Sequence, residues 1–274
     1  MTWGFNSTPT SIGIDPTGST LIVSTINRVA TIDIATLTIT TYTSMNNTDI
    51  ASTGNIYAIS PTQFYIANEI KNYVAFVSLI SGSNTFTVVQ YTKQIDTPTA
   101  VAHNPLNNTL YTAGNEEKII YSYPANSQIL PVDVTPMTPD EAFDPRFNII
   151  DLIVIVEGEK AYMYIYFVYS EIELGIISKY EINGNNLIFI GTYEFPAVIG
   201  GGLSYSNLDG TGTLRIYFSS QPLDPETRTS YVYKLYVTDG GSPIGGDPHI
   251  KPLFGQIYDL PNVESCFKLL DNKE

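Results

Sequence analysis

The first part of the chain alternates short runs of strand-forming residues with turn residues, a pattern that predicts a four-stranded meander. The first run, Ser11–Asp15, alternates polar or small residues with isoleucine, which is the period of a strand with one buried face. Pro16–Gly18 then predicts a turn. Three further runs follow, at Thr20–Thr25, Val29–Ile34 and Leu37–Thr43.

The same pattern recurs along the first half of the chain. The segments Pro9–Leu21 and Pro98–Leu110 share a Pro-Thr start, alternating small and apolar residues, an Asp-Pro or Asn-Pro turn, and a final Thr-Leu. A weaker copy lies between them at Ile56–Ile66. The turn has a physical basis, because proline presets φ and an Asp or Asn side chain can bond the backbone two residues on. The turn prolines are 45 and 44 residues apart, at Pro16, Pro61 and Pro105.

The second half predicts longer strands at less regular spacing. Prolines and acidic residues between Pro131 and Phe147 predict a long connection, and Gly200–Gly202 predicts a turn at a strand start. A fourth unit is predicted from the runs Ile149–Val156, Ala161–Tyr169, Gly175–Ile182 and Leu187–Phe195. A fifth is predicted from the runs Gly202–Ser206, Leu214–Ser219 and Ser230–Val237.

Four-stranded units at this period predict an all-β fold, a β-propeller of about five blades with a short C-terminal β tail. The units resemble blades of the YVTN or surface-layer kind. We expect the propeller to occupy residues 1–240 and the tail residues 241–274. Two alternatives stay open: a sixth blade completed by the termini, and a β-sandwich whose strands repeat by coincidence.

The charge balance narrows the classes of partner. The chain has 13 basic and 27 acidic residues, which gives a net charge of −14. Such a chain lacks the basic stripe that phosphate binding needs, so we expect no nucleic-acid partner. The start Met1–Phe5 has neither a basic nor an apolar region, and no apolar run is long enough for a bilayer, so we expect no signal peptide and no membrane span.

The tail carries a motif. Gly246–Ile250 reads Gly-Asp-Pro-His-Ile, Leu253–Gly255 reads Leu-Phe-Gly, and Tyr258 and Cys266 follow. This order resembles the start of a von Willebrand factor type D domain, although the Asp expected before Gly255 is missing. The match ends near residue 270, and the many other cysteines of such domains are absent from the chain.

Two site predictions follow from this resemblance. In some families with the motif the Asp-Pro bond cleaves itself, which here implies Asp247, Pro248 and His249 as the site, while an ordinary turn is the alternative. Cys266 is the one cysteine of the chain, so no intrachain disulfide can form and the resemblance makes it a candidate intermolecular contact.

The chain has only two histidines and one cysteine, and it contains no nucleophile elbow, P-loop or zinc motif. We therefore predict that it has no catalytic residues and is not an enzyme. We predict a non-enzymatic structural or protein-interaction propeller within a multi-protein assembly, without a cofactor. Composition similar to that of structural proteins of large DNA viruses adds a virion or capsid-associated role. The alternatives are a Ca²⁺-dependent propeller hydrolase or lactonase, with Asp and Asn as metal ligands, and a carbohydrate-binding propeller that uses tyrosines and Trp3.

Overall fold

The structure is a computed structural model. It describes residues 10–25, 28–45, 50, 56–125, 131–140, 142–197, 199–206, 214–221, 231–237, 249–250 and 258–259. Within these ranges every helix or strand that forms is a β-strand, as the sequence predicts. The chain divides into two compact units, one of residues 1–138, 154–161 and 184–186, the other of residues 139–153, 162–183 and 187–274.

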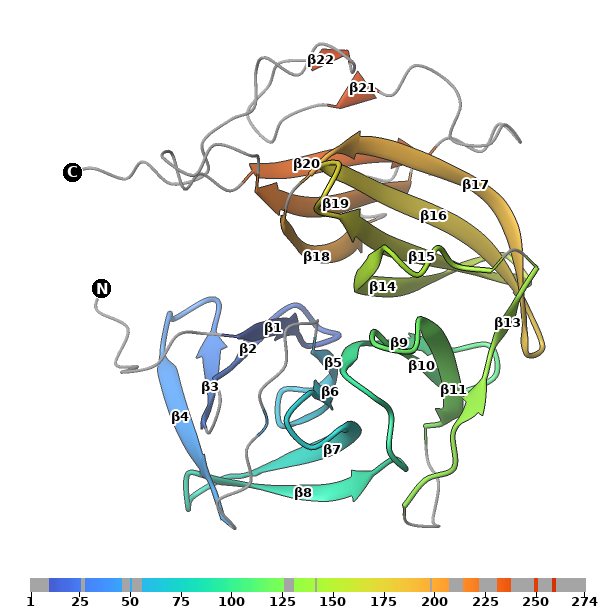
Figure 1. The fold of residues 1–274 in the computed structure, drawn as a ribbon. Helices are drawn as coiled ribbons and strands as arrows, with labels where there is room; N and C mark the ends of the chain where they lie inside the picture. The colour runs from blue at the N-terminus through green and yellow to red at the C-terminus, as the bar shows by residue number, and fades with distance from the viewer. Residues whose placement is uncertain are drawn as a thin grey trace. The chain divides into compact units, whose positions relative to one another are not determined.

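The first unit contains three antiparallel meanders with the form of propeller blades. Blade 1 consists of β1 (Ser11–Ile14), β2 (Thr20–Ser24), β3 (Arg28–Asp33) and β4 (Ile39–Ser44). Blade 2 consists of β5 (Tyr57–Ser60), β6 (Gln63–Asn68), β7 (Tyr73–Ile80) and β8 (Thr85–Tyr91). Blade 3 consists of β9 (Pro98–Asn104), β10 (Thr109–Gly114), β11 (Ile119–Pro124) and β12 (Thr135–Pro136). In Figure 1, β4 and β8 lie at the outer edge of the unit, and the first strands β1, β5 and β9 lie away from that edge.

The repeated turn between the first two strands of each blade has the predicted chemistry. The Asp15 carboxylate accepts the backbone N–H two residues on at 3.0 Å, the Asn104 amide oxygen does the same at 3.0 Å, and the Ser60 hydroxyl at 3.3 Å. Burial raises the pKa of Asp15, but the Thr17 hydroxyl and the amides of Thr20 and Thr17 donate to the carboxylate and together lower that pKa below its ordinary value. The shared hydrogen bond confirms the repeat.

Parallel pairing joins the outer strands of neighbouring blades. Thr43–Ser44 of β4 pairs with Thr85–Phe86 of β8, so that blades 1 and 2 form one eight-stranded sheet. An isolated parallel bridge between Thr92, just after β8, and Val132, just before β12, links blades 2 and 3. The sequence pattern did not predict these links, because parallel pairing between strands from different repeats depends on their packing.

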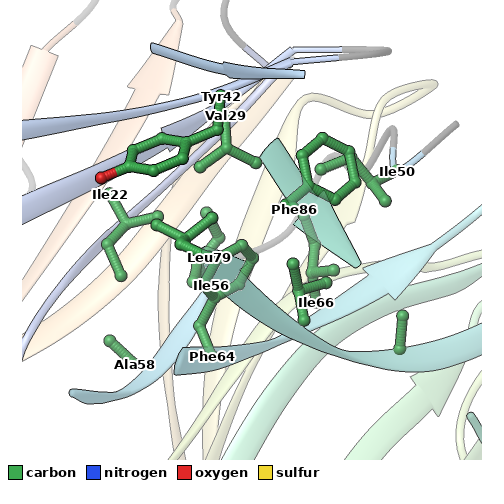
Figure 2. Close-up of a cluster of buried hydrophobic side chains, with 12 residues drawn as sticks. Ile22, Val29, Tyr42, Ile50, Ile56, Ala58, Phe64, Ile66, Leu79 and Phe86 are labelled. Atoms are coloured by element: carbon green, nitrogen blue, oxygen red, sulfur yellow. The ribbon is translucent and has the colours of Figure 1, made fainter. Parts of the chain in front are cut away.

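An apolar core lies between blades 1 and 2 (Figure 2). Val29 and Tyr42 of blade 1 face Phe64 and Phe86 of blade 2, and all four side chains are buried. The inner strands come close here as well: a Cβ added at Gly13 of β1 would lie 2.5 Å from the Ile56 carbonyl oxygen. The remaining members of this core are Ile22, Ile50, Ile56, Ala58, Ile66, Ala75, Val77 and Leu79.

The proline-rich segment predicted as a long connection contains two short strands. Thr135–Pro136 pairs with Tyr121–Ser122 of β11 and completes blade 3. Thr138–Pro139, β13, lies beside β17 at the edge of another sheet. Proline is tolerated at sheet edges because only one side of the strand needs its N–H groups.

Seven long strands agree with the predicted fourth and fifth units. The five-stranded sheet runs β13-β17-β16-β15-β14, and the three-stranded sheet runs β18-β19-β20. Gly184 has φ 60° as the first residue of the two-residue hairpin turn Gly184–Asn185 between β16 and β17, a position that favours glycine. The bounds are β14 (Asn148–Glu157), β15 (Lys160–Tyr169), β16 (Leu174–Asn183), β17 (Asn186–Pro196), β18 (Ile199–Ser206), β19 (Leu214–Gln221) and β20 (Tyr231–Val237).

The Gly200–Gly202 segment is part of a strand, so the predicted turn there is wrong. The register of β18 against β19 shifts between Gly200 and Leu203, which identifies a β-bulge. The Leu203 N–H donates at 2.7 Å to the carboxylate of Asp151, a residue with no exposed surface. Glycines are suited to the bulge because they impose no side chain on its irregular backbone.

Two short strands lie in the tail. His249–Ile250 (β21) pairs antiparallel with Tyr258–Asp259 (β22). The predicted boundary between residues 240 and 241 lies outside the described residues and stays a prediction.

Candidate functional site

The inner strands of blades 1 and 2 carry exposed isoleucines. On β1, Ile12 and Ile14 are 51% and 52% exposed, and on β5 Ile59 is 40% exposed. Residues two apart share one face of a strand, so Ile12 and Ile14 lie on the same face, opposite to the one that Gly13 presents to Ile56. On β9 of blade 3, by contrast, every residue except His103 is buried.

A hydrogen-bonded chain of side chains joins the inner strands of blades 2 and 3. The hydroxyl of Tyr57 on β5 lies 2.9 Å from Nδ1 of His103 on β9, and Nε2 of His103 lies 3.0 Å from Oδ1 of Asn108. A neutral imidazole with its proton on Nε2 satisfies both contacts, accepting from Tyr57 and donating to Asn108. The Tyr57 and His103 rings also lie 5.2 Å apart between centroids in a tilted arrangement, so a ring contact holds the imidazole as well.

We call the exposed or half-buried inner-strand residues Ile12, Ile14, Tyr57, Ile59 and His103 the inner-strand surface. It combines aliphatic side chains with a phenol and an imidazole that can exchange hydrogen bonds with a ligand. Such mixtures of apolar and aromatic groups with a few polar atoms are typical of protein contact surfaces.

Most of this surface has no signal in the sequence. Ile12, Ile14 and Ile59 follow the pattern of a buried strand face, and only the packing of the blades shows that they are exposed. His103 contacts Tyr57 and Asn108. The pairing with Tyr57 had no local signal, because the two residues are 46 positions apart.

The predicted tail sites are largely outside the described residues. Asp247, Pro248 and Cys266 lie there, as does Trp3. His249 is described only as the first residue of β21, opposite Asp259. Self-cleavage at the Asp247–Pro248 bond and an intermolecular contact of Cys266 therefore stay predictions.

The described part of the chain contains neither a cluster of metal ligands nor a membrane-spanning helix. There, no three His, Cys, Asp or Glu side chains gather closely enough to hold a metal ion. The same residues include no helix long and apolar enough to cross a bilayer.

Comparison with solved structures identifies the fold. Hydrazine synthase from Kuenenia stuttgartiensis is similar with a TM-score of 0.57 at 14% identity, over 92% of this chain and 70% of that one. The WD40 domain of Neurospora crassa Pan2 gives a TM-score of 0.52 at 9% identity, over 84% of this chain and 63% of that one. The chain has a β-propeller fold. The predicted fold class is thus confirmed, while the number of blades stays a prediction.

Sequence comparisons add no family. No protein-family model matches the chain. No curated protein matches it either. The resemblance of the tail to a von Willebrand type D domain is therefore not shown.

One prediction needs correction. A putative 6-phosphogluconolactonase from Bacteroides uniformis is similar with a TM-score of 0.57 at 11% identity, over 92% of this chain and 70% of that one. The prediction that the chain is not an enzyme is contradicted, because a protein described as an enzyme shares the fold. The short list of sequence motifs that we searched was too narrow a basis for that prediction, since a propeller assembles its site from residues of several blades.

Proposed function

We propose that this chain is a protein-binding β-propeller whose inner-strand surface docks a segment of a partner protein. The observation that supports the proposal most directly is the exposure of Ile12, Ile14 and Ile59 on inner strands. Full burial of an isoleucine side chain gains about 1.5–3 kcal/mol, so covering a half-exposed one gains roughly 1 kcal/mol. Ile12 and Ile14 share one face of β1, so one partner side chain could cover both, and Ile59 offers a separate contact on β5.

Charge gives the partner a chemical character. The chain has a net charge of −14, so its field attracts basic proteins and repels acidic ones. Tyr57 and His103 add hydrogen-bonding groups beside the aliphatic ones. We therefore expect a partner segment with an apolar side chain to cover the isoleucines and with flanking Lys or Arg.

The test compares two sets of exposed isoleucines. Ile12→Ser, Ile14→Ser and Ile59→Ser together remove the apolar part of the inner-strand surface. Ile188→Ser and Ile190→Ser on β17, where the residues are 37% and 39% exposed, are the matched control. A photo-crosslinking residue placed at position 106, on exposed Leu106 shortly after β9, reports capture in a lysate of the native source.

We expect the wild type and the β17 control to capture the same partner and the inner-strand triple variant to capture at least about ten times less, as a loss of more than 1.4 kcal/mol implies. Equal capture by all three would contradict the assignment of the inner-strand surface. A wild type that stays monomeric and captures nothing would contradict the protein-binding function itself.

The virion or capsid-associated role rests on composition, namely few lysines and many Asn, Ile, Tyr and Thr. It stays a prediction, which detection of the chain in purified virus particles would support. The two alternative functions also stay predictions: Ca²⁺-dependent thermal stabilisation together with ester or lactone hydrolysis would support the hydrolase, and binding on a glycan array would support the carbohydrate-binding propeller.

A further inference from the structure

The hairpin between β16 and β17 has an asparagine directly before a glycine at its tip. Asn183 is the last residue of β16, and Gly184 is the first residue of the turn that follows. Asn183–Gly184 is the one Asn-Gly pair of the chain. Both residues are exposed, and a Cβ added at Gly184 would meet no atom within 4 Å, so the tip is open to water.

The side chain of Asn183 and the backbone nitrogen of Gly184 are both without a hydrogen-bond partner. Among the described residues, none bonds the Asn183 side-chain amide or the Gly184 N–H. The geometry of the turn explains the free N–H, because the residues that flank a two-residue hairpin turn bond each other and leave the first turn residue unpaired. A nucleophilic nitrogen and an amide carbon therefore lie side by side along the chain, with no contact that holds either in place.

These two groups can react with each other. The Gly184 nitrogen attacks Cγ of Asn183, a new N–Cγ bond forms, and the nitrogen gives its proton to hydroxide from the solvent. The Cγ–Nδ2 bond breaks, and Nδ2 takes a proton from water and leaves as ammonia. Water then opens the cyclic succinimide at either carbonyl, which gives aspartate or isoaspartate at position 183. The reaction consumes water and releases ammonia, and glycine favours it because no Cβ shields the attacking nitrogen.

Other asparagines in the turns of the described chain lack one or both of these free groups. Asn104 precedes Pro105, whose nitrogen carries no proton. The Oδ1 of Asn108 lies 3.0 Å from Nε2 of His103, which holds the side-chain amide. The Thr109 N–H that follows it donates at 3.2 Å to a neighbouring side chain, so the nitrogen is engaged as well.

We propose that Asn183 is a modification site, at which the folded protein deamidates through a succinimide formed with Gly184. Asn183 ends a strand, so its backbone has to leave the extended conformation before the nitrogen reaches Cγ. The reaction is therefore slower in the folded chain than in the unfolded one, and faster at Asn183 than at asparagines whose amides are bonded. The site does not depend on the proposed protein-binding function.

The product changes the sheet as well as the charge. Isoaspartate inserts an extra backbone carbon at the end of β16 and so alters the hairpin on which the short strand β13 pairs. The Thr138 N–H donates to the Asn185 carbonyl at 2.8 Å, and the Asp140 N–H donates to the Leu187 carbonyl at 2.9 Å. Both products also add a negative charge to a chain whose net charge is already −14.

The test is incubation of the whole folded chain in mildly alkaline buffer, followed by digestion and mass spectrometry. We expect the peptide that contains Asn183 to gain the mass that replaces –NH₂ by –OH, in an aspartate and an isoaspartate form, while the peptides with Asn104 and Asn108 stay unchanged. Gly184→Ala should lose most of this conversion, because the added methyl group crowds the nitrogen. Asn183→Gln is a second variant for the case that Gly184→Ala does not fold, and it should lose the conversion because its longer side chain forms a larger, slower ring.

Thr109→Gly is the matched control, since it creates a second Asn-Gly pair at Asn108, where the amide and the following N–H are both bonded. Asn108 should stay unconverted in this variant while Asn183 reacts as in the wild type. The proposal would be overturned if Asn183 stayed intact in the folded wild type and reacted only in urea. Equal conversion of Asn108 and Asn183 in Thr109→Gly, or undiminished conversion in Gly184→Ala, would overturn it as well.

Discussion

The close approach of β1 and β5 makes Gly13 the position where one added methyl group should matter most. A Cβ at residue 13 would lie 2.5 Å from the carbonyl oxygen of Ile56 and 2.8 Å from its Cβ. Ordinary contact begins near 3.4 Å, so the strands would have to separate by about 3.4 − 2.5 = 0.9 Å. The obstacle is backbone, which cannot move aside as a flexible side chain can.

The cost can be estimated from three contributions. Overpacking of this kind costs about 1–3 kcal/mol. Separation of the strands also removes the hydrogen bond from the Ile56 N–H to the Ile12 carbonyl, 3.3 Å long, which contributes about 1 kcal/mol. Against this, Ala restricts the unfolded chain and stabilises by about 0.4–1 kcal/mol. We therefore expect Gly13→Ala to lower the free energy of unfolding by about 2 kcal/mol.

Urea unfolding measures this loss of unfolding free energy in Gly13→Ala, with Gly114→Ala as the comparison variant. At residue 114 an added Cβ would lie 3.1 Å from a ring carbon of Tyr121, a side chain that can yield, so we expect a loss below about 1 kcal/mol. Should Gly13→Ala prove as stable as Gly114→Ala, the inner strands are not packed as closely as described.

Three further predictions concern buried polar groups. The buried Asp151 carboxylate accepts the N–H groups of Leu203 and Leu152 on its two oxygens, and Asp151→Asn leaves only one oxygen to accept them. We expect urea unfolding to show a loss of about 2–3 kcal/mol, and an unchanged midpoint would contradict the role of Asp151 in holding the bulge. The pKa of Asp15 is lowered in the folded state, so its stabilising contribution is present above the ordinary value of 3.8 and is lost as pH falls through the lowered pKa. Asp15→Asn should therefore flatten the decline of stability below about pH 4 in an acid titration, and a decline as steep as in wild type would refute the assignment. Tyr193→Phe removes a buried hydroxyl without a partner, so its melting temperature should stay equal or rise; a clear fall would show that the hydroxyl has a partner.

The sequence by itself determined the elements that depend on local chemistry. Strand runs and their turns follow from β-propensity, from alternation and from residues that bond backbone groups two positions away. This is why the four strands of blade 1 lie within about two residues of their predicted bounds, and why Asp15 and Asn104 cap their turns as predicted. The propeller fold also follows, because a repeat with a period of one blade is a property of the sequence.

Only the tertiary structure decided how the repeats meet. The Thr92–Val132 bridge and the Tyr57–His103 contact each join residues about 40 or more positions apart, and no local pattern encodes such a pairing. The sequence also does not predict that Ile12 is exposed, because the alternating pattern of a strand is the same whether or not another element covers its apolar face. The inner-strand surface therefore depends on the packing of blades against one another, which the sequence pattern of a single blade does not contain.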